Sequence, residues 1–332
     1  MKQRAIEGVN LGGWLLLERW MTPSVFAGTD ALDEFNFSQI PGAKERIEKH
    51  RQTFMVEADW QWLAAQHITH VRLPVGYWVL EDDAPYFGAA YYLDWAFEMA
   101  EKYDIKILLD LHGLKGSQNA EMHSGRIGHV EWKKYIDDHI ALLETLAKRY
   151  ADSAALWAIE IINEPRVVGQ YFALLRYYRR AYTVLRSIVR PGTYIIFHDG
   201  FMPLIFSGAL RAKQQFPVVM DTHFYGVFPG LLRKISAQQY DGIRGMIFKP
   251  VIWLTQLAQP LIIGEWGSVV PQHFFDRVPQ EKHLPLIGET ITRQRHMYHR
   301  ALATFYWNYK TEGRGMYNYR SLIEDGIITH KV

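Results

Sequence analysis

Two glutamates in this sequence directly follow short apolar stretches and stand beside turn-forming residues. Glu164 comes after residues 157–163 and before Pro165, and Glu265 comes after residues 260–264 and before Trp266. Two carboxyl groups on either side of a glycosidic bond can cleave it, because one protonates the leaving oxygen while the other attacks the sugar carbon or activates water. The sequence therefore predicts hydrolysis of an acetal, provided that the fold brings Glu164 and Glu265 together.

The residues around Glu164 predict how it is placed. The preceding stretch is apolar and β-branched, which is typical of a strand covered on both faces. Pro165 lacks a backbone donor and restricts the residue before it, so we expect the strand to end there with Glu164 extended at its tip. In a retaining mechanism the carboxyl groups lie about 5–5.5 Å apart, the acid has a raised pKa and the nucleophile stays ionised. A single glutamate at a strand end is also typical of a solvated loop, so the hypothesis depends on the pair.

Strands and helices alternate along the whole chain. We predict eight strands at residues 6–10, 70–74, 106–112, 158–163, 194–197, 218–223, 261–265 and 304–308. Amphipathic stretches with apolar residues three and four apart lie between them, for example at 57–67, 91–103, 132–150 and 171–189. This alternation predicts an α/β fold with a parallel sheet, and eight repeats predict a (β/α)8 TIM barrel forming a single domain over residues 1–332. No Gly-x-Gly-x-x-Gly motif follows the first strand, which argues against a dinucleotide-binding fold.

The functional side chains of such a barrel gather at the C-terminal ends of its strands. The predicted strand ends carry mostly polar or aromatic residues, among them Arg72, His112, Asn163, His223, Tyr225 and Trp307. The cation and the phenol could keep a carboxylate nucleophile ionised, and the amide could hold the hydroxyl beside the reacting carbon. The histidines could bind other hydroxyls and tune the acid, and the indole could form a floor under the sugar. Each residue also has a structural explanation, as the partner of a buried acid or as part of the core.

Composition excludes several other functions. The chain has 332 residues, 48% of them hydrophobic, and a net charge of +2, which gives no sign of nucleic acid or an anionic membrane as partner. It has no cysteine, hence no disulfide and no thiolate metal site. It has no His-x-x-x-His pair, so we expect no metal and no cofactor. No signal peptide and no run of membrane-spanning length is visible, which favours the cytoplasm unless a signal for secretion or the periplasm has been removed.

Eight short motifs resemble one known family in its order along the chain. They are residues 8–14 (GVNLGGW), 71–78 (VRLPVGYW), 110–113 (DLHG), 116–119 (GSQN), 163–165 (NEP), 223–225 (HFY), 264–266 (GEW) and 307–313 (WNYKTEG). The sequence resembles glycoside hydrolase family 5, a retaining (β/α)8 group, and within it the exo-β-1,3-glucanases of fungi. The resemblance implies that Glu164 is the acid/base and Glu265 the nucleophile. It also implies that the polar strand-end residues above surround the cleaved sugar, and that Glu18 and Asn119 contact sugar hydroxyls.

The departures from the glucanase pattern concern sugars beyond the cleaved bond. The group tends to have Glu-Pro-Tyr where this chain has Glu18-Arg19-Trp20, with Trp20 a further candidate for substrate binding. Residues 120–125 also differ, and Asn308 stands where the group has an uncharged or aromatic residue. We expect a β-linked oligo- or polysaccharide substrate, with β-1,3-glucan preferred.

Several alternatives stay open from the sequence. An endo-β-1,4-glucanase, a mannan-degrading enzyme or a glucosylceramide-type β-glucosidase would keep the same mechanism. The apolar segment 226–253 could then line a site for a lipid aglycone. A catalytically silent barrel that only binds glycans is the alternative from another class. The sequence does not indicate exo or endo action, transglycosylation or an oligomeric state.

Overall fold

The fold is a closed barrel of eight parallel strands, in which each strand pairs with the next and β8 pairs with β1. The computed structural model describes residues 5–329, apart from 211–214, 226–234, 269 and 271. The strands are β1 Ile6–Asn10, β2 His70–Gly76, β3 Lys106–Gly113, β4 Leu156–Glu160, β5 Tyr194–His198, β6 Val218–His223, β7 Leu261–Trp266 and β8 Ala303–Tyr306. The predicted (β/α)8 architecture is therefore confirmed.

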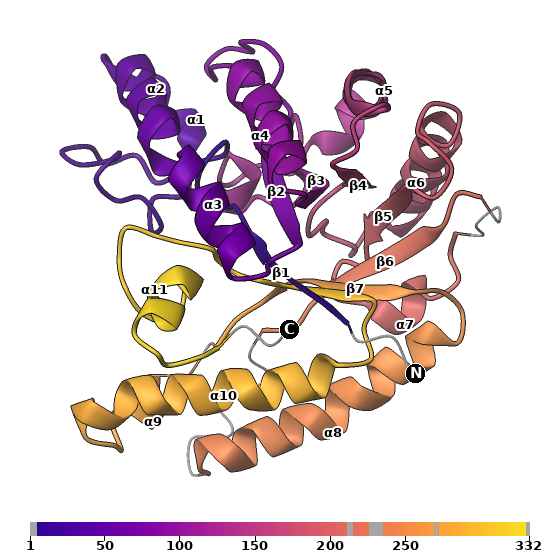
Figure 1. Cartoon of the computed structure of the whole chain (residues 1–332). Helices are drawn as coiled ribbons and strands as arrows, with labels where there is room; N and C mark the ends of the chain where they lie inside the picture. The colour runs from indigo at the N-terminus through magenta and orange to yellow at the C-terminus, as the bar shows by residue number, and fades with distance from the viewer. Residues whose placement is uncertain (1–4, 211–214, 226–234, 269, 271, 330–332) are drawn as a thin grey trace.

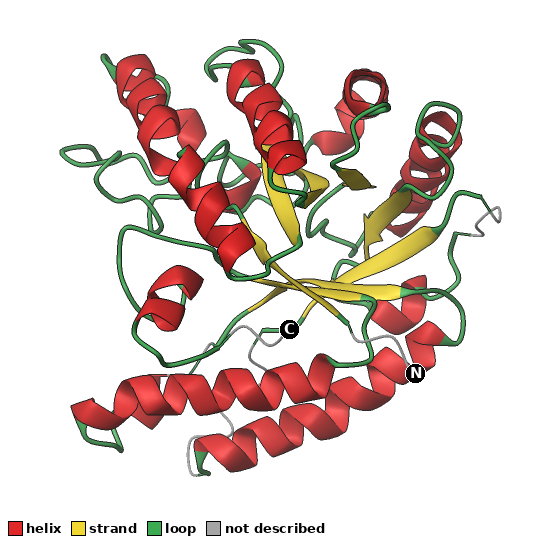
Figure 2. Cartoon of the chain, viewed as in Figure 1, coloured by secondary structure: helices red, strands yellow, loops and turns green. Residues whose placement is uncertain are grey.

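Helices surround the strands, as Figures 1 and 2 show. The α-helices are α1 Glu34–Phe37, α2 Ala43–Phe54, α3 Glu57–Ala65, α4 Ala90–Lys102, α5 Ile136–Tyr150, α6 Tyr171–Leu185, α7 Pro203–Phe206, α8 Ala237–Gln256, α9 Gln272–Phe275, α10 His283–Tyr298 and α11 Tyr319–Glu324. Short 3-10 turns are η1 Met122–Ser124, η2 Trp132–Tyr135 and η3 Gln280–Lys282. Within the described residues, no helix has the length and apolar character needed to cross a membrane.

Several predicted elements differ from the structure. The fourth strand ends at Glu160 rather than at residue 163, and the eighth ends at Tyr306 rather than at 308. In both strands the backbone pairing with the neighbouring strand ends before the residues that face the site. The apolar sequence continues past this point, and for that reason the predicted strands were too long. The fifth strand is followed by α7, a helix of only 4 residues. The predicted helix at 132–150 begins as the 3-10 turn η2 before it becomes α5.

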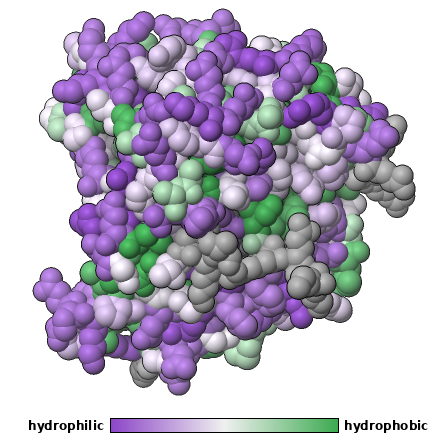
Figure 3. Space-filling view, in the orientation of Figure 1, coloured by the Kyte–Doolittle hydropathy of each residue, from purple (hydrophilic) through white to green (hydrophobic). Residues whose placement is uncertain are grey.

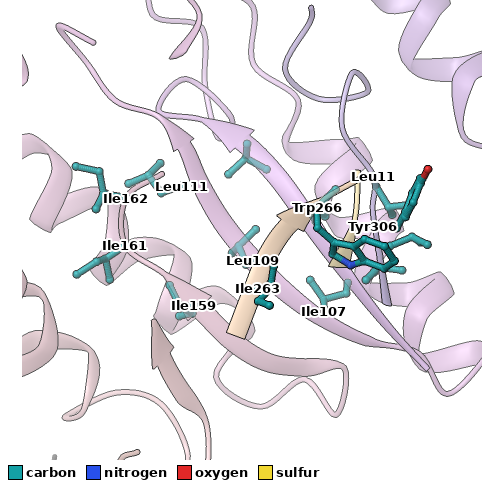
Figure 4. Close-up of a cluster of buried hydrophobic side chains, with 14 of the residues drawn as sticks. Leu11, Ile107, Leu109, Leu111, Ile159, Ile161, Ile162, Ile263, Trp266 and Tyr306 are labelled. Atoms are coloured by element: carbon teal, nitrogen blue, oxygen red, sulfur yellow. The ribbon is translucent and has the colours of Figure 1, made fainter. Parts of the chain in front are cut away.

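Alternate side chains of the strands point outward and pack against the helices. In β3 these are Ile107, Leu109 and Leu111, all buried, and Ile159 of β4 and Ile263 of β7 join the same cluster. Figure 4 shows these side chains around the strands. Burial of apolar area of this kind is the main favourable contribution to folding. The residues between them point into the barrel, where they can contribute to a functional site.

The inside of the barrel has an apolar floor and a polar layer above it. The floor contains Leu108, Ala158, Ile196, Val219, Ile262, Ala303 and Phe305. Two residues further along their strands, Leu108 is followed by Asp110, Ala158 by Glu160 and Val219 by Asp221, all with 0% exposure. Because successive side chains of a strand alternate between its two faces, these carboxylates line the interior above the floor.

Gly264 makes room for this polar layer. A Cβ atom at this position would stand 1.8 Å from Asp221 Oδ2, and the Gly264 amide donates to Asp221 Oδ1 at 2.6 Å. Any larger residue would displace the carboxylate. The glycine before Glu265 is thus explained by the close approach of the neighbouring strand.

The apolar segment 226–253 can be placed only in part. Residues 226–234 lie outside the described residues, and most of the rest belongs to α8, which lies beside α10 on the flank of the barrel (Figure 1). Two residues of α8 reach the chain just after β6, because Arg244 donates to the Phe224 carbonyl and Phe248 stacks on the Phe224 ring. An aglycone site along this segment stays a prediction. Figure 3 shows the same side as mainly hydrophilic, with hydrophobic residues gathered between hydrophilic ones.

Candidate active site

Arg72 connects most of the polar residues at the C-terminal ends of the strands. Its Nε donates to Glu160 Oε2 at 2.8 Å, and its Nη1 donates to Glu265 Oε1 at 2.9 Å. Its Nη2 donates to Asn163 Oδ1 at 2.8 Å and lies 3.0 Å from Asp110 Oδ2. Burial alone would lower the pKa of Arg72, but the surrounding carboxylates hold it well above its usual value. Arg72 is therefore a permanent cation that pairs with a buried acid and with Glu265 at the same time.

Glu265, at the end of β7, is held through both carboxyl oxygens. Oε1 accepts from Arg72, and Oε2 accepts from the Tyr225 hydroxyl at 2.8 Å. Burial, with the charges of Glu265 and Glu164, holds the pKa of Tyr225 well above its usual value, so the phenol remains a donor. A cation and a hydrogen-bond donor are what an ionised nucleophile requires.

Glu164 lies beyond the end of β4 in a conformation that differs from the prediction. Its φ is +43°, in the left-handed region, whereas Pro165 led us to expect extended backbone. The Glu164 carbonyl accepts a hydrogen bond from Asn119 Nδ2 at 3.0 Å, which helps to hold this backbone. A non-glycine residue in this region is strained, and such strain is common where a side chain must be aimed into a site.

Glu164 and Glu265 face one another across His223. His223 Nδ1 lies 2.6 Å from Glu164 Oε1 and 3.6 Å from Glu265 Oε2. The separation of these two carboxyl oxygens cannot exceed the sum of the two distances. Two carboxyl oxygens this close accommodate the about 5–5.5 Å that separates the carboxyl groups of retaining glycosidases. The structure therefore brings together the two glutamates predicted from the sequence.

The protonation of Glu164 differs from the expectation of a raised pKa. Burial alone would raise it, but hydrogen bonds and charges from His123 and His223 lower the pKa of Glu164 well below its usual range. His223 donates to Glu164 through Nδ1 and to Asp221 through Nε2, the latter at 3.3 Å. Burial would lower the pKa of His223, but Glu265, Asp221 and Glu164 hold it well above its usual value. Glu164, His123 and His223 therefore titrate as one coupled group rather than independently.

His112 and Asn163 form a second hydrogen-bonded unit beside the glutamates. His112 Nδ1–H donates to Asp110 Oδ2 at 2.6 Å, and Nε2 accepts from Asn163 Nδ2 at 3.3 Å. Gln118 connects the two backbones, because its Nε2 donates to the His112 carbonyl at 2.6 Å and the Asn163 carbonyl at 2.9 Å. His112 and Asn163 therefore lie next to the glutamates, as predicted. Asp110 fixes the orientation of the imidazole ring, and Arg72 fixes that of the amide.

The aromatic and outer candidates lie around this centre in different ways. Trp307 is 4% exposed and stacks on His112, with ring centroids 5.7 Å apart. Glu18 is buried and accepts from the Trp20 indole at 2.8 Å, while Trp20 itself is 41% exposed. Burial raises the pKa of Glu18 despite the nearby histidines. Glu18 lies close enough to Glu265 for the two charges to interact, and Trp20 and Trp307 connect to the site through Glu18 and His112.

Asn308, one of the departures from the glucanase pattern, and Asn119, a position that matches it, both bond to the protein itself. Asn308 accepts from the Gly12 amide and donates to the Gly12 carbonyl, both at 2.9 Å. It is 1% exposed, so our expectation that Asn308 faces a distant sugar is wrong. The Asn119 amide contacts the Glu164 carbonyl, His123 and the Glu121 amide, so its polar atoms already bond to the protein.

Sequence reasoning missed His123 and the three buried acids of the polar layer. His123 Nε2 lies 3.2 Å from Glu164 Oε2. The signal for Asp110, Glu160 and Asp221 was present, since each is a carboxylate inside an otherwise apolar strand at the period of two that faces the barrel interior. His123 has no such signal, because it lies on the 3-10 turn η1.

Two groups of side chains in the described residues have the spacing of metal ligands. They are Glu164 with His198 and His223, and Glu160 with Asp221 and His223, whose ligand atoms lie within 4.8 Å of one another. In both groups His223 already bonds to a carboxylate through each of its nitrogens. A protonated histidine cannot ligate a metal, so binding would require His223 to lose its proton.

Comparison with known proteins shows the family. Residues 33–313 match the cellulase family, glycosyl hydrolase family 5. The chain is 35% identical over 284 residues to a probable glucan 1,3-beta-glucosidase A of Aspergillus niger, covering 81% of this chain and 66% of that protein. It is 36% identical over 279 residues to the protein of the same name from Emericella nidulans, covering 80% and 67%. The chain thus spans about two thirds of the length of these relatives.

Solved structures agree on the fold. The rutinosidase of Aspergillus niger superposes with a TM-score of 0.80 at 21% identity, covering 98% of each chain. Endo-glycoceramidase II from Rhodococcus sp. superposes with a TM-score of 0.62 at 16% identity, covering 98% of this chain and 79% of the other. With this barrel, the facing glutamates and the match over residues 33–313, the chain belongs to glycosyl hydrolase family 5.

Proposed function

We propose that this protein is a retaining β-glycoside hydrolase that acts on β-glucans or β-glucosides, with β-1,3-glucan as its preferred substrate. The observation that carries the proposal is the shared contact of His223 with Glu164 and Glu265. It brings the two carboxyl groups within reach of one glycosidic bond, at a spacing that suits a retaining mechanism.

The two carboxyl groups take different roles in the reaction. Glu265 attacks the anomeric carbon and forms a covalent glycosyl-enzyme, while Glu164 gives a proton to the departing oxygen. Water then enters, Glu164 takes its proton, and the hydroxide replaces Glu265 with net retention of configuration. Arg72 and Tyr225 are bonded to Glu265 and support its negative charge before attack and after its release.

The other candidate residues bind the sugar around the reacting bond. Asn163, fixed by Arg72 and Gln118, stands beside Glu164 where it can hold the neighbouring sugar hydroxyl. His112 and Trp307 stack on each other and form an aromatic surface. Glu18 and the half-exposed Trp20 extend the site outward. Aromatic faces and buried polar groups in combination suit sugars, which have apolar ring faces and polar edges.

Support for a β-1,3-glucan comes from the relatives named glucan 1,3-beta-glucosidase, which are 35–36% identical to this chain. A β-1,4-glucan, mannan or a lipid-linked glucoside would use the same two glutamates. Substrate choice depends on residues away from the cleaved bond, such as Trp20, where this chain departs from the glucanase pattern.

Two measurements test the proposal. NMR of the first-formed anomer during hydrolysis should show the β-anomer, and formation of the α-anomer would refute a retaining mechanism. Laminarin, carboxymethylcellulose, mannan and aryl β-glucosides, assayed side by side, should show the fastest release of sugar from laminarin. Preference for mannan or carboxymethylcellulose would overturn the β-1,3 assignment and leave the mechanism in place.

A further inference from the structure

His123 occupies the one oxygen of Glu164 that His223 does not hold. His223 Nδ1 bonds to Glu164 Oε1 at 2.6 Å, so Oε2 is left for proton transfer to a substrate. His123 Nε2 lies 3.2 Å from that Oε2, and the two side chains are 20% and 12% exposed. An imidazole therefore stands at the point where the acid must meet the leaving group.

The position of His123 is built into the loop after β3. The neighbouring Ser124 is 1% exposed, and its hydroxyl pairs with that of Ser117 at 2.6 Å. Gly125 follows with a φ of +87°, and its amide donates to the Met122 carbonyl at 2.9 Å. The turn that presents His123 is thus fixed on both sides, so the ring is aimed at Glu164 by the fold.

Asn119 makes the proton between His123 and Glu164 a shared one. Its Oδ1 accepts from the Glu121 amide at 3.0 Å and its Nδ2 donates to the Glu164 carbonyl at 3.0 Å, which fixes the amide orientation. The same Nδ2 lies 2.7 Å from His123 Nε2. Two donors cannot face each other, so Nε2 carries no proton while it accepts from Asn119, and Glu164 Oε2 at 3.2 Å is then the nearest group that can hold that proton.

Opposing charges favour the other position of this proton. Burial alone would lower the pKa of His123, but Glu164, Glu18 and Glu265 raise it to about 9. The ring of His112 lies against His123 with centroids 5.5 Å apart, and His223 stands on the far side of Glu164. The carboxylates thus favour the proton on His123, while the Asn119 amide favours an unprotonated Nε2 that has passed its proton to Glu164.

We propose that His123 is a positioning residue that holds the proton which Glu164 delivers to the leaving group. This inference rests on the proposed role of Glu164 as acid/base. In the first step the Nε2–H bond of His123 breaks as an O–H bond forms on Glu164 Oε2, and that proton passes to the departing oxygen. In the second step Glu164 takes a proton from water and returns it to His123 Nε2. Protons and charge balance over the cycle.

Leaving-group dependence separates this role from a structural one. 2,4-Dinitrophenol leaves as an anion without protonation, whereas phenol needs an acid. We expect His123→Asn to lower kcat/KM for phenyl β-glucoside about 10–100-fold, at the low end of general acid catalysis. For 2,4-dinitrophenyl β-glucoside the loss should stay within about 3-fold, because kcat/KM reports the first step only. The alkaline limb of the pH profile of kcat/KM for phenyl β-glucoside should also move to lower pH in this variant. The reason is that His123, whose pKa is raised to about 9, no longer holds the proton.

The exposed His129 lies on the same loop and gives a matched control, because His129→Asn should leave both substrates unchanged. If His123→Asn does not fold, His123→Gln keeps a donor but cannot transfer a proton, and it should show the same selective loss. Equal losses on both substrates with an unchanged pH profile would overturn the proposal.

An NMR titration tests the shared proton without relying on activity. The pKa of His123 should fall by about one pH unit or more in Glu164→Gln, because the carboxylate that holds its proton has been removed. An unchanged titration would overturn the proposal. If the wild-type protein hydrolyses neither glucoside, the proposed function fails, while the titration still decides whether His123 and Glu164 share a proton.

Discussion

The surroundings of the two glutamates differ in the type of group that bonds to each, a guanidinium and a phenol at Glu265 and two imidazoles at Glu164. Glu265 is bonded to Arg72 and Tyr225, whose pKa values are both held well above their usual range, so both partners keep their protons. Glu164 lies instead between two histidines, at 2.6 Å and 3.2 Å. Fixed charge suits a nucleophile, and exchangeable protons suit an acid/base. This difference between the partners supports Glu265 as the nucleophile and Glu164 as the acid/base.

Replacement of Glu265 should have the largest effect. In Glu265→Gln the attacking carboxylate is absent, and we expect kcat to fall by at least about 10⁴-fold, as for the loss of a nucleophile in other hydrolases. The loss should be the same for phenyl and dinitrophenyl β-glucosides, because attack is required for both. Rates can be measured by release of the phenol.

Binding should survive this replacement, since a glutamine has nearly the same shape. Laminari-oligosaccharide affinity, measured by calorimetry, should stay within a few-fold of the wild type, and the exposed Glu281→Gln variant should behave as wild type in both assays. A Glu265→Gln protein that still hydrolyses at the wild-type rate would remove Glu265 from the mechanism and favour another nucleophile.

Replacement of Glu164 should be costly only where an acid or base is needed. We expect Glu164→Gln to lower kcat/KM for phenyl β-glucoside about 10²–10⁴-fold and to affect dinitrophenyl β-glucoside far less. With the activated substrate the glycosyl-enzyme should accumulate, because no base is left to activate water. A burst of dinitrophenol and an acceleration by azide would show this.

Azide is the decisive addition, because it attacks the glycosyl-enzyme without needing a base. The product should be the β-glycosyl azide, identified by NMR. Equal losses on both glucosides, with no response to azide, would show that Glu164 is not the acid/base and would abolish the contrast between the two glutamates.

The sequence was sufficient for the strand order and for the residues at strand ends. Glu265, His223 and Arg72 all stand in or at the end of apolar runs, and the rule that barrel chemistry gathers at the C-terminal ends then brought them together. This worked because strand periodicity is local and because closure of the barrel places all eight ends on one side. The precise end of β4 was missed, since the apolar residues Ile161 and Ile162 continue past the last pairing.

The sequence was insufficient where placement depends on contacts distant in the chain. The left-handed φ of Glu164 contradicts the local preference imposed by Pro165, and its carbonyl is held by Asn119 from another loop. His123 reaches the site through a 3-10 turn, which has no hydrophobic period to detect. The lowered pKa of Glu164 likewise depends on His123, so it could not be foreseen without that residue.

Removal of Arg72 should destabilise the fold as well as the site. Arg72 is 0% exposed and faces Asp110, Glu160 and Glu265 at 2.8–3.0 Å, so Arg72→Met would leave buried carboxylates without their cation. Breaking a buried ion pair costs about 3–5 kcal/mol. We expect the free energy of unfolding, measured in urea, to fall by about this amount. As a control, Arg179→Met at an exposed position of α6 should change the free energy of unfolding by less than about 0.5 kcal/mol. If the two variants lost the same amount of stability, Arg72 would not be the cation that stabilises the buried carboxylates.

Tyr225→Phe should have the smallest effect and sharpen the contrast between the glutamates. It removes one donor from Glu265 Oε2, which now accepts at 2.8 Å, and leaves Arg72 on Oε1. A hydrogen bond to a charged group contributes about 1.5–3 kcal/mol, so we expect kcat/KM to fall about 10–100-fold. The loss should be equal for phenyl and dinitrophenyl β-glucosides, because Tyr225 supports the nucleophile and takes no part in protonating the leaving group. The exposed Tyr91→Phe should be silent. A Tyr225→Phe loss confined to phenyl β-glucoside would instead place Tyr225 with Glu164, and the division between fixed charge on one side and exchangeable protons on the other would no longer hold.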